Sequence, residues 1–68
     1  MLTLTINGKP MELATATATL AEVVTRMGLE GKRIAIERNG EIVPRSRYAI
    51  TLVASGDRLE IVGAVGGG

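Results

Sequence analysis

Two Asn-Gly pairs, Asn7-Gly8 and Asn39-Gly40, each lie between short stretches in which apolar and polar residues alternate. Both residues of such a pair tolerate positive φ, so the pattern is the strongest short-range signal of a β-hairpin. The chain is therefore expected to contain one hairpin at its start and another near its middle. The predicted strands of these hairpins are residues 2–6 with 9–14, and residues 33–38 with 41–43.

Pro10 restricts where the first hairpin can lie. Proline has no N–H to donate to a neighbouring strand, so the strand that contains it belongs where no ladder bond is needed, as at a sheet edge.

One amphipathic helix is predicted between the hairpins. Thr19 and Glu22 have the spacing of a capping box, in which each side chain binds a free backbone N–H at a helix start. An apolar stripe with helical spacing follows, and Gly28 then suits a left-handed cap. The helix is expected at about residues 20–27, and residues 14–19 before it are expected to form a loop. The stripe consists of Leu20, Val23, Val24 and Met27.

The last third of the chain predicts shorter elements. Pro44 ends a strand, residues 45–49 are polar and irregular with room for one helical turn, and residues 51–53 form a short apolar patch. Residues 58–62 alternate again and predict a final strand. The predicted order is β-β-α-β-β-β, which corresponds to an α+β domain with a mixed four- to five-stranded sheet and one helix across it. We expect this domain at residues 1–62 and a tail at residues 63–68.

Composition narrows the functional classes. The chain has 68 residues, of which 46% are hydrophobic, and a net charge of +1, which disfavours a nucleic-acid binder. Cysteine is absent, and neither a signal peptide nor a membrane-spanning apolar run is recognisable. A protein of the cytoplasm that binds neither membrane nor nucleic acid is therefore expected.

The side chains offer little for catalysis. The sequence has no histidine or cysteine, and its seven acidic residues are spaced singly on predicted surfaces. Neither metal-ligand spacing nor a phosphate-binding glycine loop is present. We therefore predict a protein that is not an enzyme and that binds no cofactor or metal itself.

The tail is the remaining candidate. Four of its six residues are glycine, so it is expected to be flexible, and fully extended it would reach about 20 Å. Gly68 places no side chain beside the terminal carboxylate, so a partner enzyme could approach that group closely. A leftover glycine-rich linker is the alternative explanation for the tail.

Three segments carry a family resemblance that extends over essentially the whole chain. Residues 35–46 (AIERNGEIVPRS), residues 56–62 (GDRLEIV) and the final Val65-Gly66-Gly67-Gly68 resemble the sulfur carrier of bacterial thiamine biosynthesis. Such carriers have the ubiquitin-like β-grasp fold, which agrees with the predicted element order.

The resemblance implies chemistry at Gly68. An adenylating enzyme of the ubiquitin-activating type would use ATP and Mg²⁺ to convert the C-terminal carboxylate into an acyl-adenylate. A sulfur-donor enzyme would then supply sulfur to form a thiocarboxylate, which delivers it to thiazole synthase. Val65, Gly66 and Gly67 would enter the partner's active site. The resemblance also implies that partners bind the open sheet face, where the candidate residues are Arg45, Arg47, Arg58, Val62 and Val65.

Other functions remain open at this point. Carriers for molybdopterin, cysteine or tRNA thiolation share the fold and the Gly-Gly end, and so do ubiquitin-like modifiers that are joined to lysines of target proteins. A non-covalent binding module with an inert tail would also fit. A thiocarboxylate detected by mass would exclude the last of these.

Overall fold

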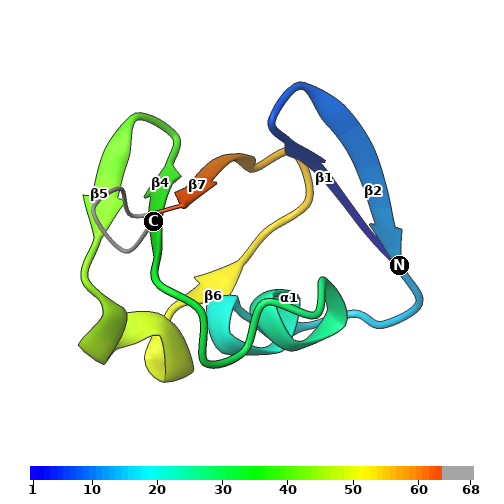
Figure 1. The fold of residues 1–68 in the computed structure, drawn as a ribbon. Coiled ribbons are helices and arrows are strands. Elements are labelled where there is room, and N and C mark those ends of the chain that lie inside the picture. Colours follow the sequence, from blue (N-terminus) through cyan, green and yellow to red (C-terminus); the bar gives the residue numbers. More distant parts are fainter. Residues whose placement is uncertain (64–68) are drawn as a thin grey trace.

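The computed structural model describes residues 1–63, which form a five-stranded sheet with a helix against one face (Figure 1). The strand order in the sheet is β2-β1-β7-β4-β5. The first and last strands in sequence therefore lie side by side, and β7 is central. The strands are β1 (Leu2–Ile6), β2 (Lys9–Leu13), β4 (Ile34–Arg38), β5 (Glu41–Val43) and β7 (Arg58–Gly63).

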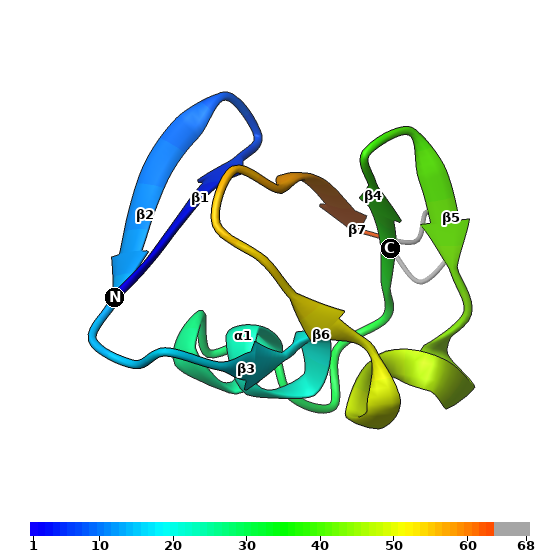
Figure 2. The same cartoon turned by 180° about the vertical axis from the view of Figure 1, so that it is seen from behind.

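The other elements lie together on one side of this sheet. Helix α1 (Leu20–Arg26) lies across its concave side, next to the 3₁₀ helix η1 (Arg45–Ile50). Strands β3 (Ala18–Thr19) and β6 (Leu52–Val53) form a separate two-stranded sheet, visible from behind in Figure 2. The result is the two-layer α+β architecture predicted from the sequence.

Both predicted hairpins are confirmed. Asn7 and Gly8 have φ values of 52° and 83°, and Asn39 and Gly40 have 51° and 90°, so both turns use the left-handed backbone that Asn-Gly favours. Strand β2, which contains Pro10, lies at the edge of the sheet and, within the described residues, pairs with β1 alone, as the missing N–H requires.

The helix start is also confirmed, but the loop predicted before it is partly wrong. The Thr19 Oγ1 accepts a hydrogen bond from the Glu22 N–H at 3.2 Å, and the Glu22 Oε1 accepts one from the Thr19 N–H at 3.0 Å. The helix ends at Arg26, with Met27 as its cap. Ala18 and Thr19 form strand β3 instead of loop, because the distant residues of β6 pair with them.

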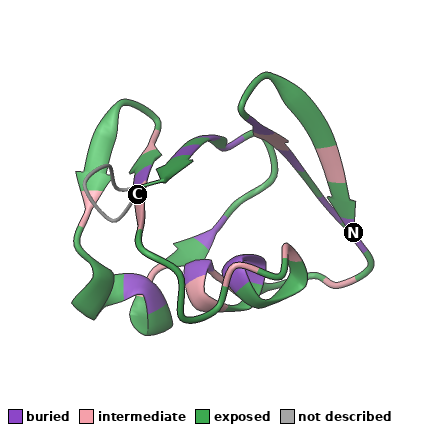
Figure 3. Cartoon of the chain, in the orientation of Figure 1, coloured by how far each residue is buried: buried purple, intermediate pink, exposed green. Residues whose placement is uncertain are grey.

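The core is aliphatic, with one aromatic member. Buried side chains from α1 and from the inward faces of the strands form a single cluster, and Figure 3 shows burial concentrated between the two layers. Tyr48 is only 7% exposed and brings η1 into this cluster. The six most completely buried large side chains are Leu4, Leu13, Leu20, Val23, Ile36 and Leu59.

Candidate functional site

Strand β7 leads to the residues predicted to carry the chemistry. The predicted sites at Val65, Gly66, Gly67 and Gly68 lie outside the described residues. Strand β7 continues to Gly63, one residue beyond the predicted end, because Gly63 pairs with Ile34 of β4. The described chain therefore approaches the predicted site along the central strand of the sheet.

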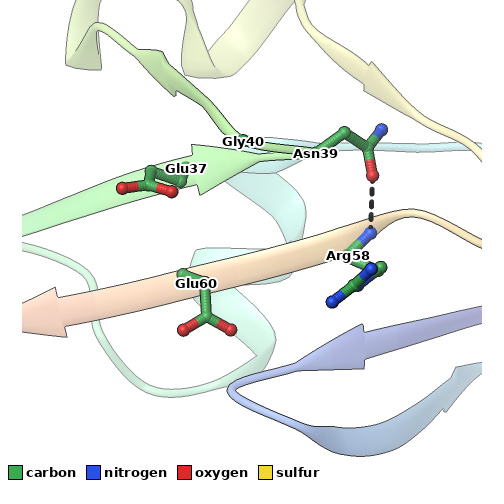
Figure 4. A pocket seen from close by; sticks show the side chains of 5 residues that line it. All are labelled: Glu37, Asn39, Gly40, Arg58 and Glu60. Atoms are coloured by element: carbon green, nitrogen blue, oxygen red, sulfur yellow. Dashed lines mark hydrogen bonds between the residues drawn. The ribbon is translucent and has the colours of Figure 1, made fainter.

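Side chains from both hairpin turns bind β7. The Asn7 Nδ2 donates to the Ile61 carbonyl oxygen at 2.9 Å, and the Ile61 N–H donates to the Asn7 Oδ1 at 2.8 Å. On the other side, the Arg58 N–H donates to the Asn39 Oδ1 at 2.9 Å (Figure 4). Sequence reasoning assigned these asparagines to turns only, because nothing local indicates that their amides reach a strand so far along the chain.

Asp57 contradicts the prediction that every acidic residue is exposed. It is 6% exposed, and its carboxylate accepts hydrogen bonds from the Arg38 Nε at 2.7 Å, the Ala54 N–H at 2.8 Å and the Asn39 Nδ2 at 3.1 Å. Burial raises the pKa of this carboxyl, but the Ala54 N–H, Arg38 and Asn39 outweigh it, so the net pKa lies below the usual 3.8. The ionised carboxylate therefore fixes the turn from which β7 starts.

The sheet face opposite α1 combines apolar and charged groups beside the end of β7. Arg58, Glu60 and Val62 are exposed and alternate with buried residues of β7. Glu37 of β4 lies directly opposite Glu60, and Figure 4 shows both on this face. Like charges directly opposite each other destabilise a sheet, so folding does not explain this pair.

The residues predicted to bind a partner lie on two different parts of the domain. Arg58 and Val62 lie on the open sheet face, and Val62 is 58% exposed. Arg45 and Arg47 are exposed on η1, which packs beside α1 and not on that face. The Arg45 Nη2 donates to the Lys32 carbonyl oxygen at 2.9 Å, so this side chain also links η1 to the loop between α1 and β4.

The described residues hold no cluster of three or more His, Cys, Asp or Glu side chains that could bind a metal. Within residues 1–63, none of the helices has the length and apolar character needed to cross a membrane.

Comparison with curated proteins supports the predicted family. The chain is 37% identical over 65 residues to "Sulfur carrier protein ThiS" of Bacillus subtilis, a match covering 96% of this chain and 98% of that protein. It is 43% identical over 65 residues to "Thiazole synthase" of Paramagnetospirillum magneticum, covering 96% of this chain but 20% of that protein. The chain thus spans about a fifth of the length of that thiazole synthase.

A solved structure shows the same fold. The crystal structure of the thiamine biosynthesis protein ThiS from Geobacter metallireducens superposes with a TM-score of 0.85 at 29% identity. The match covers 98% of this chain and all of that one. The β-grasp fold implied by the resemblance is therefore confirmed.

The family itself follows from the sequence match. The ThiS family matches residues 4–68, nearly the whole chain. A member of this family is a sulfur carrier and not an enzyme. This agrees with the prediction made from the lack of catalytic residue types in the sequence. We conclude that the chain belongs to the ThiS family, the sulfur carrier proteins of thiamine biosynthesis.

Proposed function

We propose that the sulfur is carried on the C-terminal carboxylate of Gly68. The carboxylate oxygen attacks the α-phosphorus of ATP in a partner adenylating enzyme that uses Mg²⁺, and pyrophosphate leaves. Hydrosulfide supplied by a sulfur-donor enzyme then attacks the carbonyl carbon and displaces AMP, and the resulting thiocarboxylate delivers its sulfur to thiazole synthase. The observation that supports this most directly is the likeness to a curated sulfur carrier over 98% of that carrier's length.

Elementary chemistry explains why activation is needed. A free α-carboxyl titrates near pH 3.3–3.7, so it is ionised at neutral pH and is a poor electrophile. Adenylation removes that charge from the carbonyl and provides a leaving group. ATP and Mg²⁺ are therefore consumed by the partner, and we expect the carrier to work in the cytoplasm, where ATP is made available.

Thiazole synthase as the final partner has its own support. The chain resembles a segment of a thiazole synthase that is about five times its length, so a sequence of this kind occurs within one polypeptide with that enzyme. Joining two modules in one chain raises their effective concentration for each other, which suits a carrier and the enzyme that it supplies.

We place partner docking on the open sheet face. Val62 and Ile42 are 58% and 64% exposed there, and the carboxylates of Glu37 and Glu60 lie beside them. Arg58 lies near these two carboxylates but forms no ion pair with either within the described residues. Apolar groups next to such a carboxylate pair suit a protein partner that contributes both an apolar surface and a lysine or arginine. Docking there would bring the partner next to Gly63, at the end of β7.

An intact-mass measurement tests the proposal. The protein is incubated with an adenylating enzyme that charges a ThiS-family carrier, with ATP, Mg²⁺ and a sulfur source. We expect a mass gain equal to one oxygen replaced by one sulfur, and no gain after deletion of Gly68. The deletion should leave the thermal midpoint within about 4 °C of the parent value, since glycine has no side chain that could be buried.

Two outcomes would contradict the proposal. An unchanged parent mass, under conditions that charge a known carrier, would exclude the terminal carboxylate as the working group. Normal charging of the chain that lacks Gly68 would show that another group bears the sulfur.

A further inference from the structure

Strand β7 is supported unequally by its two neighbours. On one side, β4 pairs with it up to Gly63. On the other side, the parallel pairing with β1 ends where Ile6 meets Leu59, because β1 turns away into the first hairpin. Among residues 1–63, the last part of β7 therefore has a backbone partner on one side only (Figure 1).

The side chain of Asn7 binds β7 just beyond the point where the pairing with β1 ends. It accepts from the Ile61 N–H at 2.8 Å and donates to the Ile61 carbonyl at 2.9 Å, and both bonds are partly buried. The Asn7 N–H itself donates to the Leu59 carbonyl at 2.9 Å. A side-chain amide has the donor and acceptor of a peptide group, so Asn7 extends the parallel ladder by one more residue.

The turn alone does not require this amide. At a φ of 52°, glycine or aspartate would also serve, as both are common in such turns. Glycine would form neither bond to Ile61, and an ionised aspartate would accept from the N–H but repel the carbonyl oxygen. Only asparagine satisfies the turn and both main-chain groups of Ile61.

Asn39 provides a natural comparison within the same chain. It begins the second Asn-Gly turn with almost the same φ, 51°, and its side chain also binds β7. It accepts from the Arg58 N–H at 2.9 Å, at the beginning of the strand. The Asn39 Nδ2 also donates to the Asp57 carboxylate at 3.1 Å. Asn39 thus binds the first residue of β7, whereas Asn7 binds Ile61, on the side where the pairing with β1 has ended.

We propose that Asn7 is a positioning residue for the sulfur-carrying terminus. By holding Ile61, it fixes the point from which the chain leaves the sheet, so that a partner enzyme need not order the end of β7 on binding. This inference rests on the proposed role of Gly68. Each additional residue whose backbone must be ordered on binding would weaken binding by about five- to thirtyfold.

The test compares Asn7→Gly with Asn39→Gly in the thiocarboxylate assay described above. Glycine keeps both turns, so each variant loses only its side-chain bonds. At a temperature where circular dichroism shows both variants folded, we expect Asn7→Gly to raise the KM of the adenylating enzyme for the carrier about tenfold with kcat nearly unchanged. We expect Asn39→Gly to change that KM by less than about twofold.

Amide hydrogen exchange provides the structural readout. The Ile61 amide should exchange faster in Asn7→Gly, whereas in Asn39→Gly it should stay protected. Asn7→Asp keeps the bond from the Ile61 N–H but not the bond to its carbonyl, so its KM should lie between those of the parent and Asn7→Gly. If Asn7→Gly does not fold, the comparison of KM and Ile61 exchange is made with Asn7→Asp in its place.

Three results would overturn the inference. A parent-like KM for Asn7→Gly, with faster Ile61 exchange, would show that Asn7 stabilises the fold without affecting transfer. An equal rise in KM for both glycine variants would indicate general loosening of β7. A parent protein that is not charged at all would instead contradict the proposed function, and this inference with it.

Discussion

Replacement of Asp57 by asparagine measures how far this small domain depends on one buried carboxylate. The side chain is 8% exposed and accepts hydrogen bonds from Arg38 of β4, from Asn39 of the turn after it and from Ala54 of the loop before β7. An amide has a single acceptor oxygen, and its NH₂ group would face at least one of the donors that now bind the carboxylate.

The expected loss can be worked out from these contacts. A hydrogen bond to a charged group contributes about 1.5–3 kcal/mol. The Arg38 side chain is 32% exposed and can bind water instead, so losing its bond should lower the free energy of unfolding only slightly. Most of the lost free energy should come from the weakened bond to the Ala54 N–H. We expect Asp57→Asn to lower the free energy of unfolding by about 2–3 kcal/mol. A domain of 68 residues has about 3–10 kcal/mol in total, so the thermal midpoint should fall by about 10–20 °C.

Urea denaturation at neutral pH, followed by circular dichroism, measures this loss. Glu30→Gln is a suitable control, because Glu30 is exposed and the change removes the same charge. The control should stay within about 0.5 kcal/mol of the parent protein. A loss below about 1 kcal/mol in Asp57→Asn would refute the assignment of Asp57 as a main anchor of the loop.

The same carboxylate predicts a pH dependence. Its pKa is lower in the folded protein than the usual 3.8, so the unfolded chain takes up a proton first as the pH falls. The stabilisation from Asp57 is therefore complete above about pH 5, and it is lost as the pH falls through the lowered folded pKa. Urea titrations across this range should show a shallower decline for Asp57→Asn, and parallel curves would contradict the assignment.

Two further predictions concern the helix and the docking face. Thr19→Ala removes the side-chain half of the capping box and should lower the free energy of unfolding by about 1 kcal/mol in urea titrations; no change would mean that water replaces the cap without loss. Val62→Asp should raise the KM of the adenylating enzyme at least about tenfold without unfolding the domain, whereas Leu52→Asp, equally exposed but on β6, should not. Equal effects of the two would refute the assigned docking face.

Local patterns made much of the fold predictable. Each Asn-Gly turn, the Thr19 capping box and the apolar stripe depend on residues within a few positions of one another, so the sequence displays them directly. The strand β3 was mistaken for loop because its partner, β6, lies more than thirty residues away. A two-residue strand carries too little pattern to be recognised without that partner.

The contacts around β7 were beyond prediction for the same reason. Asn7 and Ile61 are 54 positions apart, and Arg38 and Asp57 are 19 positions apart. An aspartate after Ser55-Gly56 has the sequence pattern of an ordinary exposed turn, and nothing local reveals the arginine that pairs with it. The predicted site at Gly68 came from the glycine pattern and the family resemblance, and it stays a prediction.

The central position of β7 has a consequence for how this protein is made. The two hairpins can form from local contacts as soon as they are synthesised, but β1 and β4 do not pair with each other and need β7 between them. An incomplete chain would therefore expose the inner edges of two separate hairpins. The strand that closes this gap is also the one that leads toward Gly68, so the sheet can close only after the last strand before the proposed sulfur carrier has been made.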